Sequence, residues 1–198
     1  MNKAVFIDKD GTLVKNIPYN VDPAKIELEP FAGRALPMLK ANGFKLIVVS
    51  NQSGVAHGFF GEDDLQVVSD RIQHLLTSEN NARIDAFYFC PHHPNARDER
   101  YALSCACRKP EPGLILQAAV DFNIDMSLSW MIGDILHDVE AGNRAGCKTI
   151  LLNNGGETEW ITNGTRWPHY IAKNLMEAAI IILQHKSDVN GIKLLHSH

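Results

Sequence analysis

The sequence predicts an α/β fold: a doubly wound, mostly parallel sheet with helices on both faces. Short apolar runs recur at 4–7, 44–49, 84–89, 128–132 and 147–152, the length of strands that are buried on both faces. Segments with helical spacing separate these runs, as expected when crossover helices join parallel strands. Polar and glycine residues follow several of the runs, at the edge where open α/β sheets bind ligands.

The length and composition are those of an ordinary globular protein. The 198 residues include 45% hydrophobic and 21% charged residues, with a formal net charge of −4. We expect one domain over residues 1–185 and a mobile tail over 186–198. No long basic stripe indicates nucleic-acid binding, and no apolar run is long enough for a membrane span. Because the N-terminus carries no signal peptide, we expect a cytoplasmic protein, and we expect a monomer.

The first apolar run ends in two carboxylates. Residues 3–13 read KAVFIDKDGTL, and Gly11 and Thr12 break the strand pattern, so Asp8 and Asp10 lie at the C-terminal end of the strand. Two like charges this close repel unless a cation or a shared proton relieves them. Oxygen ligands beside a phosphate suit Mg²⁺. The alternative interpretation is a solvated turn.

A loop rich in Asn, Pro and Asp is expected over 16–30, followed by a helix over 31–41 that contains Pro37. The second strand, 44–49, runs into the sequence Ser-Asn-Gln-Ser-Gly, which begins at Ser50. A small hydroxyl followed by polar and glycine residues can bind phosphate, although a capping Ser on an ordinary turn has the same pattern. A helix is expected over 62–76.

The third strand, 84–89, leads into a loop with metal-ligand spacing. Cys90 and His92 stand at its start and Cys105 and Cys107 at its end, so residues 90–107 can form a closed Cys₃His site that favours Zn²⁺. A site with four protein ligands is structural rather than catalytic. His93 competes with His92, and unrelated free thiols are the alternative.

Two cations, Arg108 and Lys109, follow the last of these cysteines directly. Arg suits bidentate recognition of phosphate or sugar, and Lys suits a point charge beside an anion, whereas an isolated basic pair is usually solvated. Further on, a helix is expected over 112–122, and the fourth strand, 128–132, ends at Gly133 and Asp134. Asp138 begins a helix over 138–145. The remaining elements are a strand over 147–152, a loop over 153–168, a short strand over 169–172 and a helix over 175–183.

In chain order, the strand ends and the loop at Lys109 carry Asp8 with Asp10, Ser50, Lys109, and Asp134 with Asp138. This set resembles the four motifs of the haloacid dehalogenase superfamily of phosphatases over roughly residues 3–152. Three segments narrow the resemblance to the subgroup of heptose bisphosphate and histidinol-phosphate phosphatases. They are the predicted zinc loop (residues 90–107), residues 51–56 and the sequence CRKP at 107–110. That subgroup lacks a large cap domain, and we expect none here because no stretch of this sequence is long enough to form one.

The resemblance implies a role for each motif residue. Asp8 would be the nucleophile that forms an aspartyl-phosphate, and Asp10 the general acid and base. Mg²⁺ would be held by the Asp8 carboxylate, the Asp10 main-chain carbonyl and Asp134. The resemblance also implies roles around the substrate. Ser50, Asn51 and Lys109 would bind the phosphorylated substrate, and Arg108 would reach its non-reacting part. Asp138 would orient Lys109 or a water on the metal.

Departures from the subgroup leave the substrate open. His57 stands where the subgroup usually has Arg, Ile135 replaces a Lys of several relatives, and the segment 155–160 differs. Loss of an Arg removes a bidentate anion donor, which weakens the prediction of a bisphosphate. We therefore expect a phosphatase of heptose 1,7-bisphosphate in carbohydrate metabolism, with histidinol phosphate or another small phosphomonoester as the alternative substrate. A non-catalytic, zinc-stabilised binding module is disfavoured because every catalytic position is filled.

Overall fold

The computed structural model describes residues 1–195, with the side chains of all of these except 79, 80 and 186–195. Its centre is a six-stranded sheet in the order β3-β2-β1-β4-β5-β6, with every neighbouring pair parallel. The strands are β1 (Lys3–Ile7), β2 (Phe44–Asn51), β3 (Ala86–Cys90), β4 (Trp130–Gly133), β5 (Lys148–Leu152) and β6 (Tyr170–Ala172). The expectation of an α/β fold with a doubly wound parallel sheet is confirmed.

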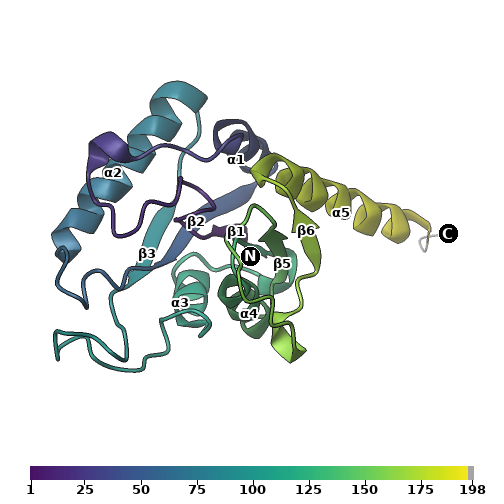
Figure 1. The fold of residues 1–198 in the computed structure, drawn as a ribbon. Helices are drawn as coiled ribbons and strands as arrows, with labels where there is room; N and C mark the ends of the chain where they lie inside the picture. The colour runs from purple at the N-terminus through teal and green to yellow at the C-terminus, as the bar shows by residue number, and fades with distance from the viewer. Residues whose placement is uncertain (196–198) are drawn as a thin grey trace.

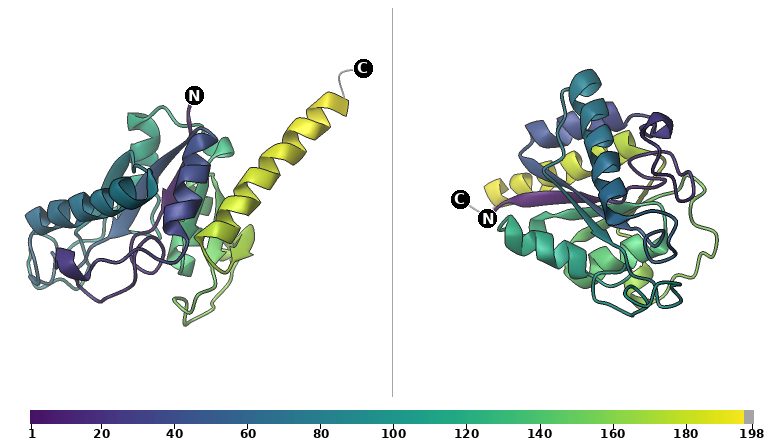
Figure 2. Two further views of the ribbon diagram at one scale, coloured as in Figure 1. Left: turned by 90° about the horizontal axis from the view of Figure 1, so that it is seen from above. Right: turned by 90° about the vertical axis from the view of Figure 1, so that its left-hand side faces the viewer.

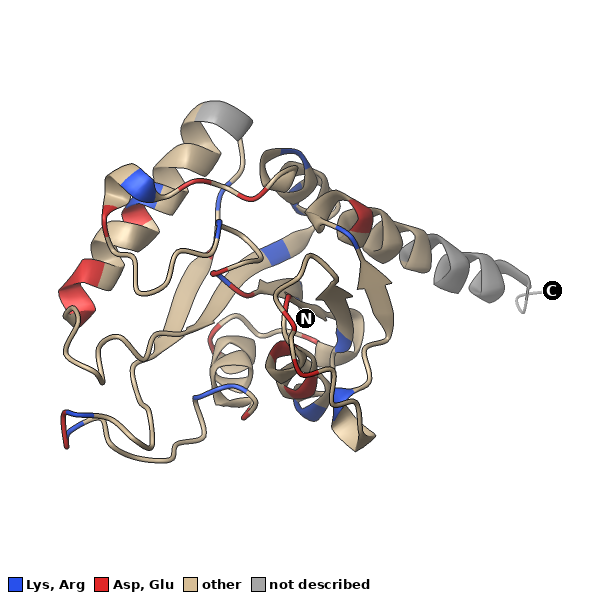
Figure 3. Ribbon diagram, in the orientation of Figure 1, with Lys and Arg blue, Asp and Glu red and all other residues tan. Residues whose placement is uncertain are grey.

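Helices cover both faces of this sheet (Figure 1). One layer holds α1 (Ala32–Ala41), α2 (Glu62–Asn80) and α5 (Leu175–Leu195), and the other holds α3 (Gly113–Asp121) and α4 (Leu136–Ala145). The right-hand view of Figure 2 shows α1 and α2 on one side of the sheet and α3 and α4 on the other. Lysines and arginines are interspersed with acidic residues over the ribbon (Figure 3). Among the described residues, no helix combines the length and the apolar character that a membrane crossing requires.

The period of two along β1 divides its side chains between the two layers. Val5 and Ile7 belong to the core beneath α1, α2 and α5, whereas Ala4 and Phe6 belong to the core beneath α3 and α4. Strand order reverses between β1 and β4, because β2 and β3 lie on one side and β5 and β6 on the other. Ligands of open α/β sheets bind at the carboxyl ends of the strands at such a reversal.

Several element boundaries differ from the sequence expectations. The third strand begins at Ala86 rather than 84, because the Asp85 side chain accepts a hydrogen bond from the Leu46 N–H at 2.8 Å. The fourth begins at Trp130 rather than 128, because a short 3₁₀ turn capped by Asp125 occupies residues 126–128. The loop over 16–30 contains another 3₁₀ turn, at Pro23–Lys25.

The predicted helices form with other limits. α2 ends at Asn80 rather than 76, and α4 begins at Leu136 rather than 138. Pro37 lies inside α1, which continues past it to Ala41. α5 extends from Leu175 to Leu195, beyond the predicted end at 183 and into the segment expected to be a tail. Residues 196–198 of that segment lie outside the described chain.

Candidate active site

Lys109 is a buried lysine at the centre of the site. Its side chain is 3% exposed, and its Nζ lies 2.5 Å from Asp8 Oδ1 and 2.6 Å from Asp138 Oδ1. The same Nζ donates to the Val49 carbonyl at 3.0 Å. Of the three N–H donors of the ammonium group, two therefore make hydrogen bonds, to Asp8 and to the Val49 carbonyl, and the contact with Asp138 is an ion pair. Burial lowers the pKa of Lys109, but Asp138 and Asp8 outweigh this effect, and the net pKa lies above its ordinary value.

The backbone of Lys109 is held by Asn51, at the end of β2. Asn51 Oδ1 accepts from the Lys109 N–H at 3.0 Å, and Asn51 Nδ2 donates to the Lys109 carbonyl at 3.0 Å. Asn51 is among the residues predicted to bind substrate. In the structure its amide fixes the main chain that carries Lys109, 58 residues further along.

Three buried carboxylates meet beside Lys109. Asp8 follows β1, Asp134 follows β4 and Asp138 lies in the first turn of α4, and each offers an oxygen within 4.8 Å of the other two. Burial raises the pKa of Asp8 to about 8, although Lys109 opposes the shift. Burial, followed by the charge of Asp138, raises the pKa of Asp134 to about 7. Carboxylate oxygens gathered in this way have the donor chemistry that Mg²⁺ prefers.

Two glycines let backbone approach the Asp134 carboxylate closely. A Cβ on Gly11 would lie 2.2 Å from Asp134 Oδ2, and a Cβ on Gly156 would lie 2.0 Å from the same atom. Gly11 also has a φ of +78°, which glycine adopts without strain. Thr12 Oγ1 donates to Asp134 Oδ1 at 3.4 Å. No contact of Thr12 or Gly156 with Asp134 was predicted from the sequence, although Gly11 and Thr12 directly follow Asp10.

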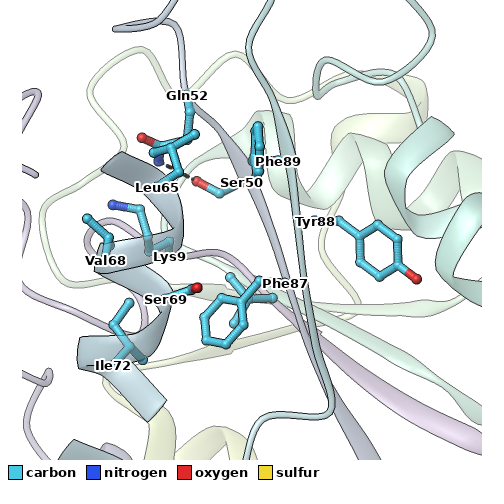
Figure 4. A pocket seen from close by; sticks show the side chains of 11 residues that line it. Lys9, Ser50, Gln52, Leu65, Val68, Ser69, Ile72, Phe87, Tyr88 and Phe89 are labelled. Atoms are coloured by element: carbon cyan, nitrogen blue, oxygen red, sulfur yellow. Dashed lines mark hydrogen bonds between the residues drawn. The ribbon is translucent and has the colours of Figure 1, made fainter. Parts of the chain in front are cut away.

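Asp10 is separated from Asp8 by one residue, Lys9. It borders a cleft of about 270 Å³. The walls of this cleft are the loop 16–20 and the turn 51–54. Asp10 Oδ1 is 2.6 Å from Lys9 Nζ, and Asp10 Oδ2 accepts from Gln52 Nε2 at 3.0 Å. Gln52 Nε2 also donates to Ser50 Oγ at 2.8 Å (Figure 4). Gln52 thus connects two predicted site residues, although the sequence predicts no role for it.

The four residues of the predicted zinc site converge. The ligand atoms of Cys90, His92, Cys105 and Cys107 all lie within 4.8 Å of one another. Their sulfur–sulfur contacts of 2.9, 3.1 and 3.5 Å are well beyond the roughly 2.05 Å of a disulfide bond. Three thiols and one imidazole at one point are the donor set of a structural zinc site. His93 lies apart from the cluster, with its ring centroid 4.9 Å from that of His57.

Arg108 is anchored to the loop 90–107, which carries the cluster of cysteines and His92. Its Nη1 donates to the His92 carbonyl at 3.1 Å, which occupies one of its five N–H donors. His57, one of the departures from the related subgroup, packs near Phe59 and His93, with ring centroids 5.8 and 4.9 Å away. The structure does not bring Arg108 or His57 into the contacts around Lys109 described above.

The other two departures meet at the start of α4. Ile135 is the residue before the helix, and its N–H donates to Asp138 Oδ2 at 3.3 Å. The Leu136 N–H donates to Glu157 Oε2 at 2.6 Å, so the segment 155–160 supplies a cap for this helix. The segment 155–160 therefore packs against Asp134 through Gly156, and through Glu157 it caps the N-terminus of the helix that carries Asp138.

Comparisons with known proteins agree with this geometry. Residues 106–178 match the model of the HAD-hydrolase-like family. The D-glycero-β-D-manno-heptose-1,7-bisphosphate 7-phosphatase of Pasteurella multocida is 35% identical over 189 residues, which cover 94% of this chain and 100% of the relative. The D-glycero-α-D-manno-heptose-1,7-bisphosphate 7-phosphatase of Burkholderia mallei is 38% identical over 151 residues, covering 76% of this chain and 79% of the relative.

A solved structure shares the fold. The D,D-heptose 1,7-bisphosphate phosphatase of B. bronchiseptica, crystallised with magnesium and phosphate, superimposes with a TM-score of 0.75 at 27% identity. The match covers 92% of this chain and 99% of that protein. The chain is therefore a phosphatase that belongs to the haloacid dehalogenase-like hydrolases, in the family of the heptose bisphosphate phosphatases.

Proposed function

We propose that this chain hydrolyses the 7-phosphate of D-glycero-D-manno-heptose 1,7-bisphosphate through an aspartyl-phosphate on Asp8. The observation that carries the proposal is the arrangement at the reversal of strand order. Asp8 lies against the buried ammonium of Lys109, and Asp10, two residues on, borders an open cleft. A nucleophile beside a fixed cation, with a second carboxyl group near the entering substrate, is what phosphoryl transfer to an enzyme carboxylate requires.

The chemistry needs two displacements at phosphorus. An Asp8 oxygen attacks the phosphorus, the bond to the sugar oxygen breaks, and Asp10 gives that oxygen its proton. A water then attacks the phosphorus of the aspartyl-phosphate and gives a proton to Asp10, and inorganic phosphate leaves with Asp8 restored. Lys109 and Ser50 would bind the phosphoryl oxygens during both steps, where charge develops.

The carboxylate cluster fits a magnesium ion. Asp8 and Asp134, with the main-chain carbonyl of Asp10, would hold it, and burial together with the charge of neighbouring carboxylates raises the pKa of both side chains. When bound, Mg²⁺ neutralises phosphate charge and orients the phosphoryl group for in-line attack. Asp138, 2.6 Å from Lys109 Nζ, would orient that lysine.

We extend the proposal to a structural Zn²⁺ on Cys90, His92, Cys105 and Cys107. It would fix the loop that ends in Arg108 and Lys109, and Arg108 would use its free donors on the non-reacting part of the sugar. The four cysteines are free thiols, which fits a reducing compartment such as the cytoplasm. We propose that residues 1–185 act there as one monomeric domain in carbohydrate metabolism.

A substrate screen tests this function. The purified protein with Mg²⁺ is assayed for phosphate release from the α and β anomers of heptose 1,7-bisphosphate and from histidinol phosphate. Relatives of both anomeric preferences match this chain, so either anomer supports the proposal. A clear preference in kcat/KM for histidinol phosphate would contradict the substrate and leave the reaction class intact.

A further inference from the structure

Lys9, between the two carboxylates of the first motif, is a buried lysine. Its side chain is 8% exposed. It continues the alternation of Val5 and Ile7, so it lies on the face of the sheet that α2 covers. Figure 4 shows Lys9 beside Leu65 and Val68 of α2, with Ser50 and Gln52 close by. Burying an ammonium group among apolar side chains is costly unless a partner compensates it, so this position requires an explanation.

The partner that the structure gives Lys9 is Asp10. Lys9 Nζ holds one oxygen of the Asp10 carboxyl group at 2.6 Å, and Gln52 Nε2 holds the other at 3.0 Å. Gln52 is itself 7% exposed and is anchored on Ser50 Oγ at 2.8 Å. The Asp10 side chain, by contrast, is 33% exposed and belongs to a turn beyond the end of β1. Lys9 and Gln52, which are both buried and come from different segments, therefore restrict the rotation of the Asp10 carboxyl group.

We propose that Lys9 and Gln52 are positioning residues that fix the Asp10 carboxyl group for proton transfer to the leaving oxygen. The inference rests on the proposed role of Asp10. A general acid works only when its proton lies within hydrogen-bond reach of the leaving atom, so rotation of the carboxyl group out of place removes its contribution. Each carboxyl oxygen has a second lone pair, so the group can bind Lys9 and Gln52 and still carry the proton.

The dependence of kcat/KM on leaving-group basicity tests this role. Phosphate esters of weakly basic phenols leave without a proton, whereas alkyl esters need one, and kcat/KM reports the first displacement only. We expect Lys9→Met and Gln52→Leu each to lower kcat/KM for alkyl phosphates by about ten- to a hundredfold, a part of the roughly 10²–10⁴ that general acids contribute. For p-nitrophenyl phosphate the loss should stay within about threefold, because no proton is needed.

Three further variants complete the design. Asp10→Asn is the reference, because it removes the acid itself. Lys9→Arg should restore the alkyl rates, since a cavity of about 30 Å³ adjoins Lys9 and gives room for the guanidinium group. Lys15→Met is the matched control, since it removes an exposed lysine that pairs with Glu27 on the surface.

The outcomes separate the inference from the function on which it rests. Steeper leaving-group dependence in Lys9→Met and Gln52→Leu, as in Asp10→Asn, supports the positioning role. Equal losses on every ester, with steepening in Asp10→Asn alone, overturn it and leave the proposed function standing. No steepening in Asp10→Asn overturns both. If Lys9→Met does not fold, Gln52→Leu gives the same decision.

Discussion

Lys109→Met removes the cation that the buried carboxylates share. The ammonium group contacts Asp8 and Asp138 at 2.5 and 2.6 Å and is almost fully buried, so a methionine of similar length fills the space without the charge. Asp8, Asp134 and Asp138 then lie together without the ion pairs that Lys109 makes in the wild type. We expect the free energy of unfolding to fall, and we expect the loss to depend on magnesium.

The size of the effect follows from the burial. Removal of one partner from a buried ion pair typically costs about 3–5 kcal/mol, because the remaining charge is left uncompensated. Asp138→Asn is the milder comparison, since an amide oxygen still accepts from Lys109, and we expect it to cost about 1–3 kcal/mol. In Lys109→Met, Mg²⁺ would bind the same carboxylates without competition from the ammonium group. Saturating Mg²⁺ should therefore reduce, by mass action, the difference in the free energy of unfolding between this variant and the wild type.

Urea unfolding, followed by circular dichroism in EDTA and in excess Mg²⁺, measures both quantities. We expect the free energy of unfolding of Lys109→Met to be lower by about 3–5 kcal/mol in EDTA and by less in excess Mg²⁺. A deficit under about 1 kcal/mol in EDTA, or one that Mg²⁺ leaves unchanged, would refute the reasoning about the shared cation.

Three other predictions concern the zinc loop, Arg108 and a partly buried ion pair. Elemental analysis should find one zinc per chain, lost in Cys107→Ser and kept in Cys147→Ser, whose cysteine lies outside the cluster; a protein with disulfides and no zinc would contradict this. Arg108→Ala should lower kcat/KM for the heptose bisphosphate roughly ten- to a hundredfold, from about 1.5–3 kcal/mol for a charge-assisted hydrogen bond, and should affect p-nitrophenyl phosphate much less. Equal losses would mean that Arg108 only braces the loop through the His92 carbonyl. Burial acts to raise the pKa of Asp85, but hydrogen bonds from Lys40 and the Leu46 N–H outweigh it and the pKa lies below its ordinary value. Asp85→Asn should therefore cost about 1–2 kcal/mol at neutral pH, and the difference should disappear in acid as the pH falls through the folded-state pKa; a difference that persists there would contradict the assignment.

The strand ends were predictable because their signal is local. The apolar run before Asp8 and the one before Asp134 each mark a buried strand, and the first carboxylate after each run falls at the same edge of a parallel sheet. Contacts between distant segments gave no such signal. Asn51 meets the backbone of Lys109 across 58 residues, and nothing in its neighbours distinguishes that role from substrate binding.

The helix boundaries and the residues that support the site were not predictable for the same reason: they depend on contacts between segments that are distant in the sequence. The helix α4 starts at Leu136 because Glu157, 21 residues away, accepts from its N–H. The choice between His92 and His93 depends on which ring the loop turns toward Cys107, and neighbouring positions in a sequence do not encode that direction. Gln52 lies in a polar turn where an amide is ordinary, and its importance comes only from Asp10 on one side and Ser50 on the other.

The measurement that tests the central claim most directly is capture of the phosphoenzyme. The protein is mixed with Mg²⁺ and substrate labelled with ³²P in the transferred phosphoryl group, quenched in acid during turnover, digested and mapped by mass spectrometry. An acyl-phosphate is labile to hydroxylamine, so we expect a hydroxylamine-labile label on Asp8 that is absent from folded, inactive Asp8→Asn. A label on another residue, or wild-type-like turnover by Asp8→Asn, would contradict it.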